Sequence, residues 1–425
     1  MNTGDTAWVL ASSALVLLMT PGLAFFYGGM TRAKSVLNLM MMSFGAIGVV
    51  SILWVLYGFS VAFGPGKSSV WGGFSWAGMK HMTAIETTVN GSVYGIPLLV
   101  FSAFQLMFAI ITVALISGAI ADRAKYLTWI LFAILWATIV YFPVAHWVFD
   151  FGDKNGDGAG WLAAKGVLDF AGGTAVHVNA GAAGLALALV LGKRVGWKRD
   201  PMRPHSLPLV VLGASLLWFG WFGFNAGSAL GANALAGQAF FTTMIATASA
   251  SVGWALVEIV RDKKATSLGA ASGAVAGLVA ITPACAFVTP TGALGLGVLA
   301  GIVCALAVGL KWKLGFDDSL DVVGVHLVGG ALGAISLGFI SNYSGSEGLF
   351  YGGKIIVLEH QALAVVAVGG FSFVVAYILG KILDLTIGFR ISEEDEVTGI
   401  DQIEHLETAY EYAGSGAGSQ LTKGL

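Results

Sequence analysis

Charged residues are scarce in this chain. Only 11% of its 425 residues are Asp, Glu, Lys or Arg, whereas 56% are hydrophobic. A soluble globular domain carries about 25% charged residues, so this composition argues against an ordinary cytosolic enzyme. In their place the sequence has a succession of apolar stretches, each reaching the roughly 20 residues that one crossing of a bilayer core needs. The sequence therefore predicts an all-α polytopic membrane protein.

Cysteine and proline are also rare. The two cysteines, Cys285 and Cys304, both fall in apolar stretches, which excludes a disulfide framework and a paired-cysteine metal or redox site. With only 9 prolines, the 60 glycines do not indicate disorder. Several recur at every fourth position, in the runs 269–277 and 297–301, and such bare faces let membrane helices approach closely. We expect these faces to pack within the helix bundle, with a subunit contact as the alternative.

Eleven apolar spans can be placed along the sequence. Of the 22 Lys and Arg residues, 17 lie in alternate connectors or around and beyond the end of the last span, and only five lie on the other side. Basic connectors stay on the cytoplasmic side, so we expect the N-terminus outside and the C-terminus inside (N-out/C-in). No basic segment or small-residue cleavage site precedes the first span, so we expect no cleaved signal peptide. The predicted spans are 6–28, 36–62, 97–120, 127–149, 170–191, 207–228, 240–260, 267–287, 292–310, 322–340 and 363–385.

The chain changes character after about residue 388. Eight acidic residues follow, against Lys423 alone beyond Arg390, and the end is rich in Gly and Ser, which is typical of disorder. We therefore divide the chain into a transmembrane domain, 1–388, and an acidic cytoplasmic tail, 389–425. Such a tail is either a solvated end or a docking and regulatory surface.

Two histidines, His177 and His326, lie well inside apolar spans. An ionisable side chain is costly there and by default marks a functional site. Each is followed by glycines four and seven residues later, on the histidine's own face of a helix, where they leave room for a close approach. The two histidines belong to the fifth and tenth spans, which run in opposite directions.

This pattern predicts an inverted repeat of five spans plus five. Repeat one covers about 1–195, repeat two about 205–342, and an eleventh helix at about 363–385 is an addition. A facing pair of imidazoles at the repeat interface is the natural inference. However, counting residues inward from Asp169 and Asp321 leaves about 10 Å between the two histidines, unless the 314–322 connector dips inward.

Two other interpretations of the histidines stay open. Each imidazole could be a structural group bonded to a backbone carbonyl. A metal or bis-histidine haem site is the third interpretation, but the only carboxylates near the pair are Asp169 and Asp321, each at least one helical turn away. We therefore expect no metal and no cofactor.

Four long motifs resemble those of bacterial ammonium transporters of the Amt/Mep/Rh family, and together they extend over nearly the whole chain. The resemblance implies an eleven-helix bundle with pseudo-two-fold symmetry, assembled as a homotrimer with one pore per subunit. It also implies ammonium transport in nitrogen uptake, not catalysis. The motifs are Pro21–Gly29 (PGLAFFYGG), Asp169–His177 (DFAGGTAVH), Gly220–Ser228 (GWFGFNAGS) and Asp321–His326 (DVVGVH).

The resemblance also implies an external recruitment site for ammonium. Aromatic faces and a serine hydroxyl would form it, and a ring face attracts a desolvated cation by about 0.5–2 kcal/mol. The corresponding residues here are Phe104, Phe149, Ser228 and Tyr141. Tyr141 has an alternative interpretation as an interfacial belt tyrosine.

Below the recruitment site, Phe108 and Phe224 correspond to a stacked gate, and His177 with His326 to the pair that lines a narrow pore. Neutral imidazole donates from one nitrogen and accepts at the other, so the pair could bind passing ammonia and relay its proton. Asp169 corresponds to an aspartate that supports the cation site. It could cap the fifth helix or touch ammonium directly, and we favour structural support.

Phe149 departs from the family pattern, because relatives commonly carry tryptophan at this position. Phenylalanine keeps an aromatic face but lacks the better cation–π surface and the indole N–H. We therefore expect weaker capture of external ammonium than in relatives with tryptophan.

Two segments lie outside the pore. In the tail, a motif containing Asp401, His405, Glu407 and Tyr410 resembles the family's cytoplasmic segment that packs under the bundle and communicates with trimeric PII-family signal proteins. This favours the docking and regulatory interpretation of the tail. The connector 153–158 matches the first half of a calcium loop, but its twelfth position would be Ala164 instead of a glutamate, so a polar turn is the better interpretation.

The expected function is ammonium transport in a bacterial cell membrane: recruitment, deprotonation and conduction of ammonia, with or without a separate proton relay. The alternative is an ammonium sensor that signals through a cytoplasmic partner, although a tail of this length is too short for a fused signalling domain. An embedded enzyme would need a nucleophile with its base and orienting group, or a redox cofactor, and the sequence contains neither. No nucleic-acid partner is expected.

Overall fold

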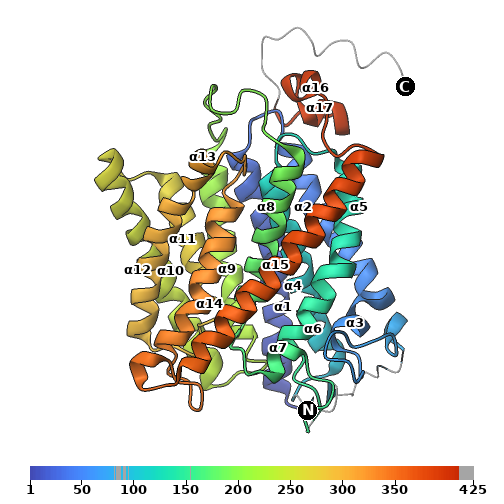
Figure 1. Ribbon diagram of the computed structural model, residues 1–425, viewed down its shortest axis with the longest axis vertical. Coiled ribbons are helices and arrows are strands. Elements are labelled where there is room, and N and C mark those ends of the chain that lie inside the picture. Colours follow the sequence, from blue (N-terminus) through green and yellow to red (C-terminus); the bar gives the residue numbers. More distant parts are fainter. Residues whose placement is uncertain (81, 83–87, 90–91, 94, 154, 411–425) are drawn as a thin grey trace.

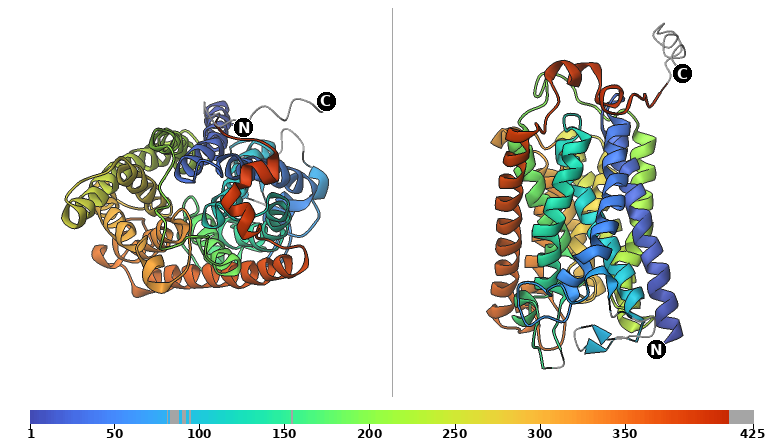
Figure 2. Two further views of the ribbon diagram at one scale, coloured as in Figure 1. Left: turned by 90° about the horizontal axis from the view of Figure 1, so that it is seen from above. Right: turned by 90° about the vertical axis from the view of Figure 1, so that its right-hand side faces the viewer.

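The structure is a computed structural model that describes residues 1–80, 82, 88–89, 92–93, 95–153 and 155–410. Long helices run between two ends of the molecule, with the N-terminus at one end and the segment beyond α15 lying across the other (Figures 1 and 2). Within the described ranges, 10 helices are long and apolar enough to cross a membrane, and α11 is a further apolar helix of 15 residues. Each of the eleven predicted spans is thus a helix.

The first five spans contain three helices interrupted or opened by π-helical turns. They are α1 (Thr3–Met30); α2 (Val36–Leu53) with η1 (Trp54–Gly58) and α3 (Phe59–Phe63); α4 (Leu98–Ile116) with η3 (Ser117–Ile120); α5 (Tyr126–Trp136) with η4 (Ala137–Tyr141) and α6 (Phe142–Phe149); and η5 (Gly173–Val178) with α8 (Asn179–Leu191).

The remaining spans are α9 (Leu207–Gly227), α10 (Ala234–Asp262), α11 (Ser267–Ile281), α12 (Pro290–Ala307) with α13 (Leu310–Leu314), η6 (Val323–Leu327) with α14 (Val328–Ile340), and α15 (Ile355–Thr386). The connectors contain the short elements η2 (Ala77–Met79), α7 (Trp161–Ala164), η7 (Leu349–Tyr351) and two strands, β1 (Thr88–Val89) antiparallel to β2 (Ser92–Val93). The tail forms α16 (Glu393–Thr398) and α17 (Ile400–His405).

The predicted starts of α10 and α15 were too late, by six and eight residues. α10 begins after Asn233, whose side chain accepts a hydrogen bond from the Ala236 N–H. α15 starts before Glu359 and His360, whose polarity ended the apolar span in the sequence. A side-chain cap sets the start of α10, whereas α15 has no side-chain cap and its first turns include polar residues that a hydropathy count leaves out.

The two glycine runs face α10, so the prediction of packing within the bundle is confirmed. A Cβ atom on Gly297 would lie 2.3 Å from the carbonyl oxygen of Ala246, and one on Gly301 would lie 2.1 Å from that of Ala250. The run 269–277 meets α10 from the other side, at Trp254 and Ala250. Only glycine lets these backbones touch.

α15 crosses the bundle diagonally (Figure 1) and contacts α5, α8 and α14. The side-chain amide of Gln361 donates to the Leu168 carbonyl at 2.7 Å and accepts from the Leu168 N–H at 2.8 Å. Farther along, the Ser372 hydroxyl donates to the Asn179 carbonyl at 2.8 Å. The Gln361 amide also donates to the Ala334 carbonyl of α14 at 3.0 Å, so the last helix ties together elements from both halves of the chain.

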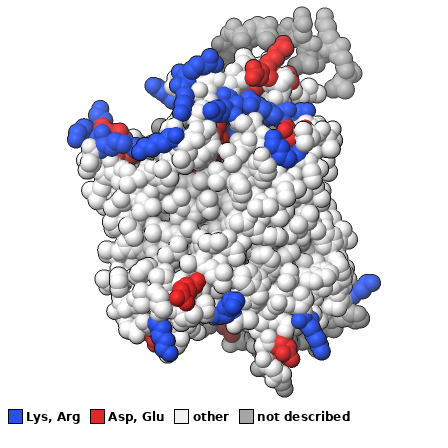
Figure 3. All heavy atoms as spheres, in the orientation of Figure 1, with Lys and Arg blue, Asp and Glu red and all other residues white. Residues whose placement is uncertain are grey.

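Charge is concentrated at the ends of the molecule. Lys and Arg side chains gather at the end where α16 and α17 lie, and the middle of the molecule is uncharged in the view of Figure 3. This distribution is typical of a protein whose middle band faces hydrocarbon.

Candidate transport pathway

His177 and His326 form a contact in the centre of the bundle. Their Nδ1 atoms are 3.2 Å apart, and their rings lie almost parallel at a centroid distance of 5.3 Å. Both side chains are buried, with exposed fractions of 1% and 3%. The predicted facing pair is therefore present.

Matching aspartates place the two histidines at the same depth. Asp169 accepts the N–H groups of Gly172, Gly173 and Thr174 at 2.6–2.8 Å, and His177 follows it by eight residues. Asp318 accepts the N–H groups of two residues at the start of η6, at 3.1 and 2.7 Å, and His326 also follows by eight residues. Each carboxylate caps the helix that carries its histidine.

A separation of about 10 Å, counted from Asp321, does not occur, and the exception named for the 314–322 connector holds. Asp321 instead forms an ion pair with Lys311, at 2.6 Å. The connector before η6 dips into the protein, so that Asp317 and Asp318 are buried. The acid that caps η6 is thus three residues earlier in the sequence than the one chosen from the hydropathy pattern.

Asp169 acts as a cap in this structure. Besides the backbone groups, it accepts the Thr174 hydroxyl. Burial raises the pKa of its carboxyl, and the hydrogen bonds from Thr174, Ala175 and Gly172 oppose that rise. Both carboxylate oxygens are used in holding the first turn of η5.

Both histidines lie in π-helical segments, η5 and η6. In η5 the His177 N–H donates to the carbonyl of Gly172, five residues earlier, at 3.1 Å. Gly172 has φ 111°, a left-handed conformation that glycine adopts without strain. Such wide turns occur often at functional sites because they change the direction of a side chain.

The contact between the imidazoles requires complementary tautomers, since only one of two facing Nδ1 atoms can donate. If His177 donates from Nδ1, its Nε2 is an acceptor. His177 Nε2 is buried and has no hydrogen-bond partner among the described residues. The pair thus presents a free imidazole nitrogen while sharing one proton internally.

Aromatic rings continue the line from the histidine pair toward the N-terminal end. Trp221 stacks on His177 at a centroid distance of 5.3 Å and an interplanar angle of 14°. Phe224 stacks on Phe108 at 4.2 Å, and Phe104 meets Phe108 edge-on at 4.9 Å. The two phenylalanines predicted as a gate are therefore in contact.

A narrow cavity of about 10 Å³ lies beside the pair, enough for one water-sized molecule. Apart from two imidazoles and one indole, its lining side chains are hydrocarbons or thioether. They are Met19, Leu23, Phe26, Ile111, Leu115, Val176, His177, Leu217, Trp221, Phe224, Val275 and His326.

Two of the residues predicted for recruitment, Phe104 and Ser228, lie at the end of this line away from the histidines. The Ser228 hydroxyl donates to the Phe224 carbonyl at 2.8 Å. Gly227 packs against the Phe104 ring so closely that a Cβ atom on it would lie 2.9 Å from a ring carbon. Phe149 ends α6, is partly buried and packs against the main core.

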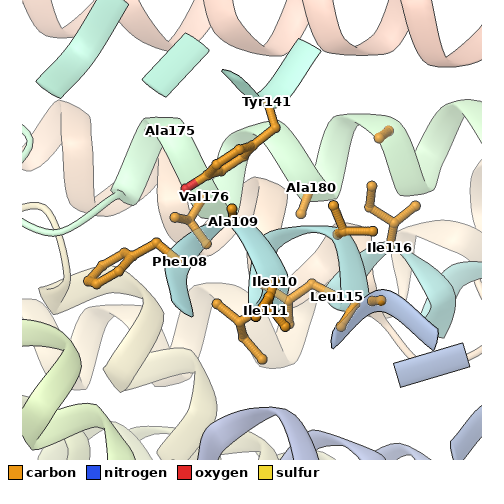
Figure 4. Close-up of a cluster of buried hydrophobic side chains, with 14 of the residues drawn as sticks. Phe108, Ala109, Ile110, Ile111, Leu115, Ile116, Tyr141, Ala175, Val176 and Ala180 are labelled. Atoms are coloured by element: carbon orange, nitrogen blue, oxygen red, sulfur yellow. The ribbon is translucent and has the colours of Figure 1, made fainter. Parts of the chain in front are cut away.

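Tyr141 ends η4 and is 1% exposed, so its alternative interpretation as an interfacial belt residue was wrong. In the close-up of Figure 4 its ring lies next to Val176, with Phe108 on the same side of the cluster. The π-helical turn before it directs the ring inward, toward the gate.

The tail docks on the opposite end of the bundle. Glu396 is 1% exposed; its carboxylate accepts from Arg32 at 3.3 Å, from Arg390 at 2.7 Å and from the Val195 N–H at 2.8 Å. Asp401 accepts the N–H groups of Leu37 and Asn38 at 3.0 and 2.8 Å. The tail thereby caps the start of α2.

Two further predicted tail residues contact the bundle. His405 Nε2 donates to the Asn38 Oδ1 at 3.0 Å, and Tyr410 bonds to His205 at 2.9 Å. Glu407, also predicted, is exposed. Glu396 and Glu404 were not among the predicted site residues. Glu404 accepts the Tyr126 N–H at 2.9 Å and caps α5. The signal in the sequence was a group of acidic residues in the tail together with two spans that begin without a capping side chain.

The 153–158 connector forms a turn. The Asp153 carboxylate accepts the N–H groups of Asn155 and Asp157 at 2.8 and 2.9 Å, and Lys154 lies outside the described residues. Ala164, at the twelfth position, ends α7. Over the part of the chain that the structure describes, no group of three or more His, Cys, Asp and Glu side chains is arranged to hold a metal ion.

Comparison with known proteins identifies the family. A profile of the Ammonium Transporter Family matches residues 7–410. An ammonium transporter of Mycobacterium tuberculosis (strain ATCC 25618 / H37Rv) is 60% identical over 96% of this chain and 91% of its own length. An ammonium transporter of Bacillus subtilis is 46% identical, covering 97% of this chain and 99% of that protein.

Solved structures share the fold. Saccharomyces cerevisiae Mep2 is 34% identical with a TM-score of 0.84, over 92% of this chain and 91% of that one. A protein described as a sensor Amt protein is 28% identical with a TM-score of 0.87, over 95% and 98%. The family match covers the spans, the histidine pair and the tail through Tyr410, so this chain belongs to the ammonium transporter family and is a multi-pass membrane protein that transports ammonium.

Proposed function

We propose that the chain captures ammonium at its outer end, removes one proton and conducts ammonia past His177 and His326. The observation that carries this proposal is the 3.2 Å contact between two buried imidazole nitrogens beside an otherwise apolar cavity. A fixed polar pair in such surroundings can bind a small neutral molecule but offers little to a bare cation.

Capture begins at the aromatic entrance. The faces of Phe104 and Phe149, the Ser228 hydroxyl and Tyr141 form the recruitment site, and a ring face contributes about 0.5–2 kcal/mol toward a desolvated cation. Asp169 supports the site by fixing the first turn of η5, because its carboxylate accepts hydrogen bonds from four consecutive backbone N–H groups, 172–175.

The gate comes next. The Phe108–Phe224 stack, with ring centroids 4.2 Å apart, closes the path and must part for each molecule. A charged ammonium ion would have to give up its water beyond this point, at a cost of several kcal/mol, whereas ammonia is neutral and small enough for the cavity.

The histidine pair supplies the proton acceptor. With His177 donating from Nδ1, a proton arriving at its Nε2 lets the shared proton move to His326 Nδ1, and His326 can release its own proton from Nε2. The proton and the ammonia thus have separate exits through one site. Potassium has no proton to release, so it gains nothing from the pair.

We also propose the N-out/C-in orientation and the five-plus-five inverted repeat, with boundaries near 1–195 and 205–342 and the added helix at 363–385. The equal spacing of Asp169 to His177 and Asp318 to His326 supports the repeat, as does the π-helical turn around each histidine. The gathering of Lys and Arg at the tail end (Figure 3) supports the orientation.

Residues 389–425 are proposed as a regulatory tail for a PII-family signal protein, on a homotrimer. The carboxylates of Glu396, Glu404 and Asp401 hold the described part of the tail against three separate segments of the bundle. A partner that displaces this tail would uncover the helix starts of α2 and α5. Asp401, His405 and Tyr410 are the contacts it would compete with, and exposed Glu407 is available to it directly.

The decisive measurement is transient current from proteoliposomes on a solid-supported membrane, with ammonium and then potassium jumps. We expect wild type to respond to ammonium alone and His177→Ala to lose that discrimination. His360→Ala serves as the control, since that histidine lies at the start of α15, away from the pair. Indistinguishable ammonium-to-potassium ratios for all three proteins would refute the histidine mechanism.

A sensing function is the second candidate, favoured by the docked tail. The solved structure described as a sensor Amt protein covers 95% of this chain, so the same scaffold can carry that role. If the proteoliposomes stay silent for ammonium in current, swelling and internal pH, while added ammonium changes the protection of the tail from protease, sensing would replace transport by the histidine pair.

A further inference from the structure

Trp221 makes the closest aromatic contact with the histidine pair and is itself held by a hydrogen bond. Its indole lies on His177 at 14° to the imidazole plane. Its Nε1–H donates to the hydroxyl of Thr282 at 2.8 Å. The indole is 2% exposed and lines the cavity.

Thr282 is one member of a buried polar chain. Its Oγ1 lies 2.7 Å from the Leu278 carbonyl and 3.2 Å from Asn225 Oδ1. The Asn225 amide then donates to the Thr243 hydroxyl at 2.9 Å, which donates in turn to a carbonyl of α10 at 2.6 Å. Asn225, Thr243 and Thr282 are fully buried, so the chain links α9, α10 and the end of α11.

The position of Thr282 follows from the length of α11. This helix ends at Ile281 after 15 residues, which leaves Thr282 and Pro283 inside the bundle at the depth of the histidines. Pro283 packs against Gly173 at the start of η5, so closely that a Cβ atom on Gly173 would lie 2.4 Å from the proline ring. One two-residue segment therefore contacts the indole on one side and the helix of His177 on the other.

We propose that Thr282 is a positioning and specificity-determining residue: its hydroxyl holds Trp221 parallel to His177 and occupies the indole N–H. This inference rests on the proposed role of the histidine pair. With the indole N–H engaged, the imidazole nitrogens are the polar groups that the cavity lining offers to a passing molecule. A free indole N–H would donate to the lone pair of ammonia or to water, and a tilted indole would widen the cavity for larger ions.

The test compares three substitutions in the full-length protein. Thr282→Val keeps the volume of the side chain and removes the hydroxyl, whereas Thr282→Ser keeps the hydroxyl. Thr247→Val is the matched control, because Thr247 is equally buried and its hydroxyl donates to the Thr243 carbonyl of its own helix at 2.6 Å, with no other partner among the described residues.

The readout is the ratio of the ammonium response to the potassium and methylammonium responses on the solid-supported membrane. A ratio does not depend on how much protein is folded. We expect Thr282→Val to lower it about 2- to 10-fold, the range that one hydrogen bond corresponds to, and Thr282→Ser and Thr247→Val to keep the wild-type value.

Thr243→Val adds a second arm that leaves Thr282 intact. It removes the anchor of Asn225, so the ratio should fall in the same direction by a smaller factor. This arm decides the question if Thr282→Val does not fold: a wild-type ratio in Thr243→Val then overturns the proposal.

Two further outcomes would overturn it as well. A wild-type ratio in Thr282→Val would mean that the indole needs no clamp, and an equal loss in Thr247→Val would mean that any buried threonine hydroxyl has the same effect. If the histidine mechanism itself fails, the result is different, because the response ratio of His177→Ala would then also equal the wild-type ratio.

Discussion

At the scale of single residues, the site depends on how few polar groups the bundle leaves beside the cavity. The two imidazoles use one nitrogen each on one another, and the indole above them is engaged by Thr282. Each acceptor or N–H that remains free beside the cavity has a large effect on what binds there, because leaving a buried polar group without a hydrogen bond costs about 1–3 kcal/mol. The informative substitutions are therefore those that add or remove a single polar group.

Phe149 gives a prediction of this kind. Phe149→Trp adds a stronger cation–π surface and an indole N–H at the entrance, so the concentration of ammonium at half-maximal current should fall, by roughly 2- to 5-fold if the gain is about 0.5–1 kcal/mol. Maximal current should change little, since the gate and the pair are untouched.

The measurement is a concentration series of current on the solid-supported membrane. Phe151→Trp is a suitable control, because Phe151 lies two residues farther along, is 59% exposed and precedes the 153–158 turn. Equal half-saturation in wild type and Phe149→Trp would show that the lost tryptophan does not limit capture.

At the scale of elements, most of the architecture could be predicted from the sequence. Hydropathy located all eleven spans, because each must be apolar over a bilayer's thickness. It could not give the π-helical turns of η5 and η6, which depend on local hydrogen bonding, nor choose among the closely spaced acids Asp317, Asp318 and Asp321. That choice decides the depth of His326, and only the burial of the connector resolves it.

The candidate site was recovered less evenly. His177, His326 and Asp169 lie in the matched motifs and stand out as ionisable residues in or beside apolar runs, whereas Phe108 lies outside these motifs and was assigned from the resemblance alone. Thr282 and Trp221 do not stand out, since a threonine at a helix end and a tryptophan in a membrane span are both ordinary. Their pairing joins positions 61 residues apart, which no local pattern contains.

The cap of η6 leads to a prediction about pH. Burial raises the pKa of the Asp318 carboxyl from its ordinary 3.8 to about 6, with Lys311 opposing and Asp321 adding to the rise. Because the folded-state pKa lies above the unfolded one, the folded protein binds this proton more tightly. The contribution of Asp318 to the free energy of unfolding therefore increases as the pH falls through about 6 toward about 4.

Thermal unfolding in detergent from about pH 7.5 to about pH 5 checks this sign. The melting temperature of wild type minus that of Asp318→Asn should rise toward low pH, because asparagine cannot take up the proton. Asp262→Asn, an exposed acid at the end of α10, is the control. Parallel curves for wild type and Asp318→Asn would contradict the shifted pKa.

The docked tail gives a prediction for α16. Glu396→Gln removes the charge that pairs with Arg32 and Arg390, a loss of about 1–3 kcal/mol for a buried charged hydrogen bond. The tail should then spend more time undocked, and trypsin should cleave after Arg390 about 5- to 160-fold faster. Glu407→Gln, an exposed acid in the same tail, should cleave at the wild-type rate; equal rates in both variants would mean that Glu396 does not hold the tail.

At the scale of the whole molecule, the helices form a frame that is tied across its halves. α15 runs diagonally over the bundle (Figure 1) and hydrogen-bonds to the segment before η5 and to the end of that π-helical turn. The Gln361 amide also donates to the Ala334 carbonyl of α14 at 3.0 Å, so movement of α14 against the segment before η5 would break one of the bonds that this side chain makes. Transport through the motion of a few side chains, starting with the Phe108–Phe224 stack, is consistent with such a frame.

The outer surface of the frame predicts association. Phe219 on α9 and Phe241 on α10 are 58% and 53% exposed, so a second chain has large apolar side chains to pack against. We expect native mass spectrometry in a mild detergent to give a homotrimer, three times the 44.0 kDa of one chain. A monomer that retains full ammonium current would contradict the need for assembly.

The two cysteines have a practical consequence. Cys285 and Cys304 are both fully buried, so the folded native chain presents no thiol to an aqueous reagent. A single cysteine introduced at exposed Glu407 would be the one reactive site on the protein without any prior replacement of native residues. A fluorophore placed there would report docking and release of the tail in the same proteoliposomes that carry the current, so that tail movement and transport could be followed together over time in one sample.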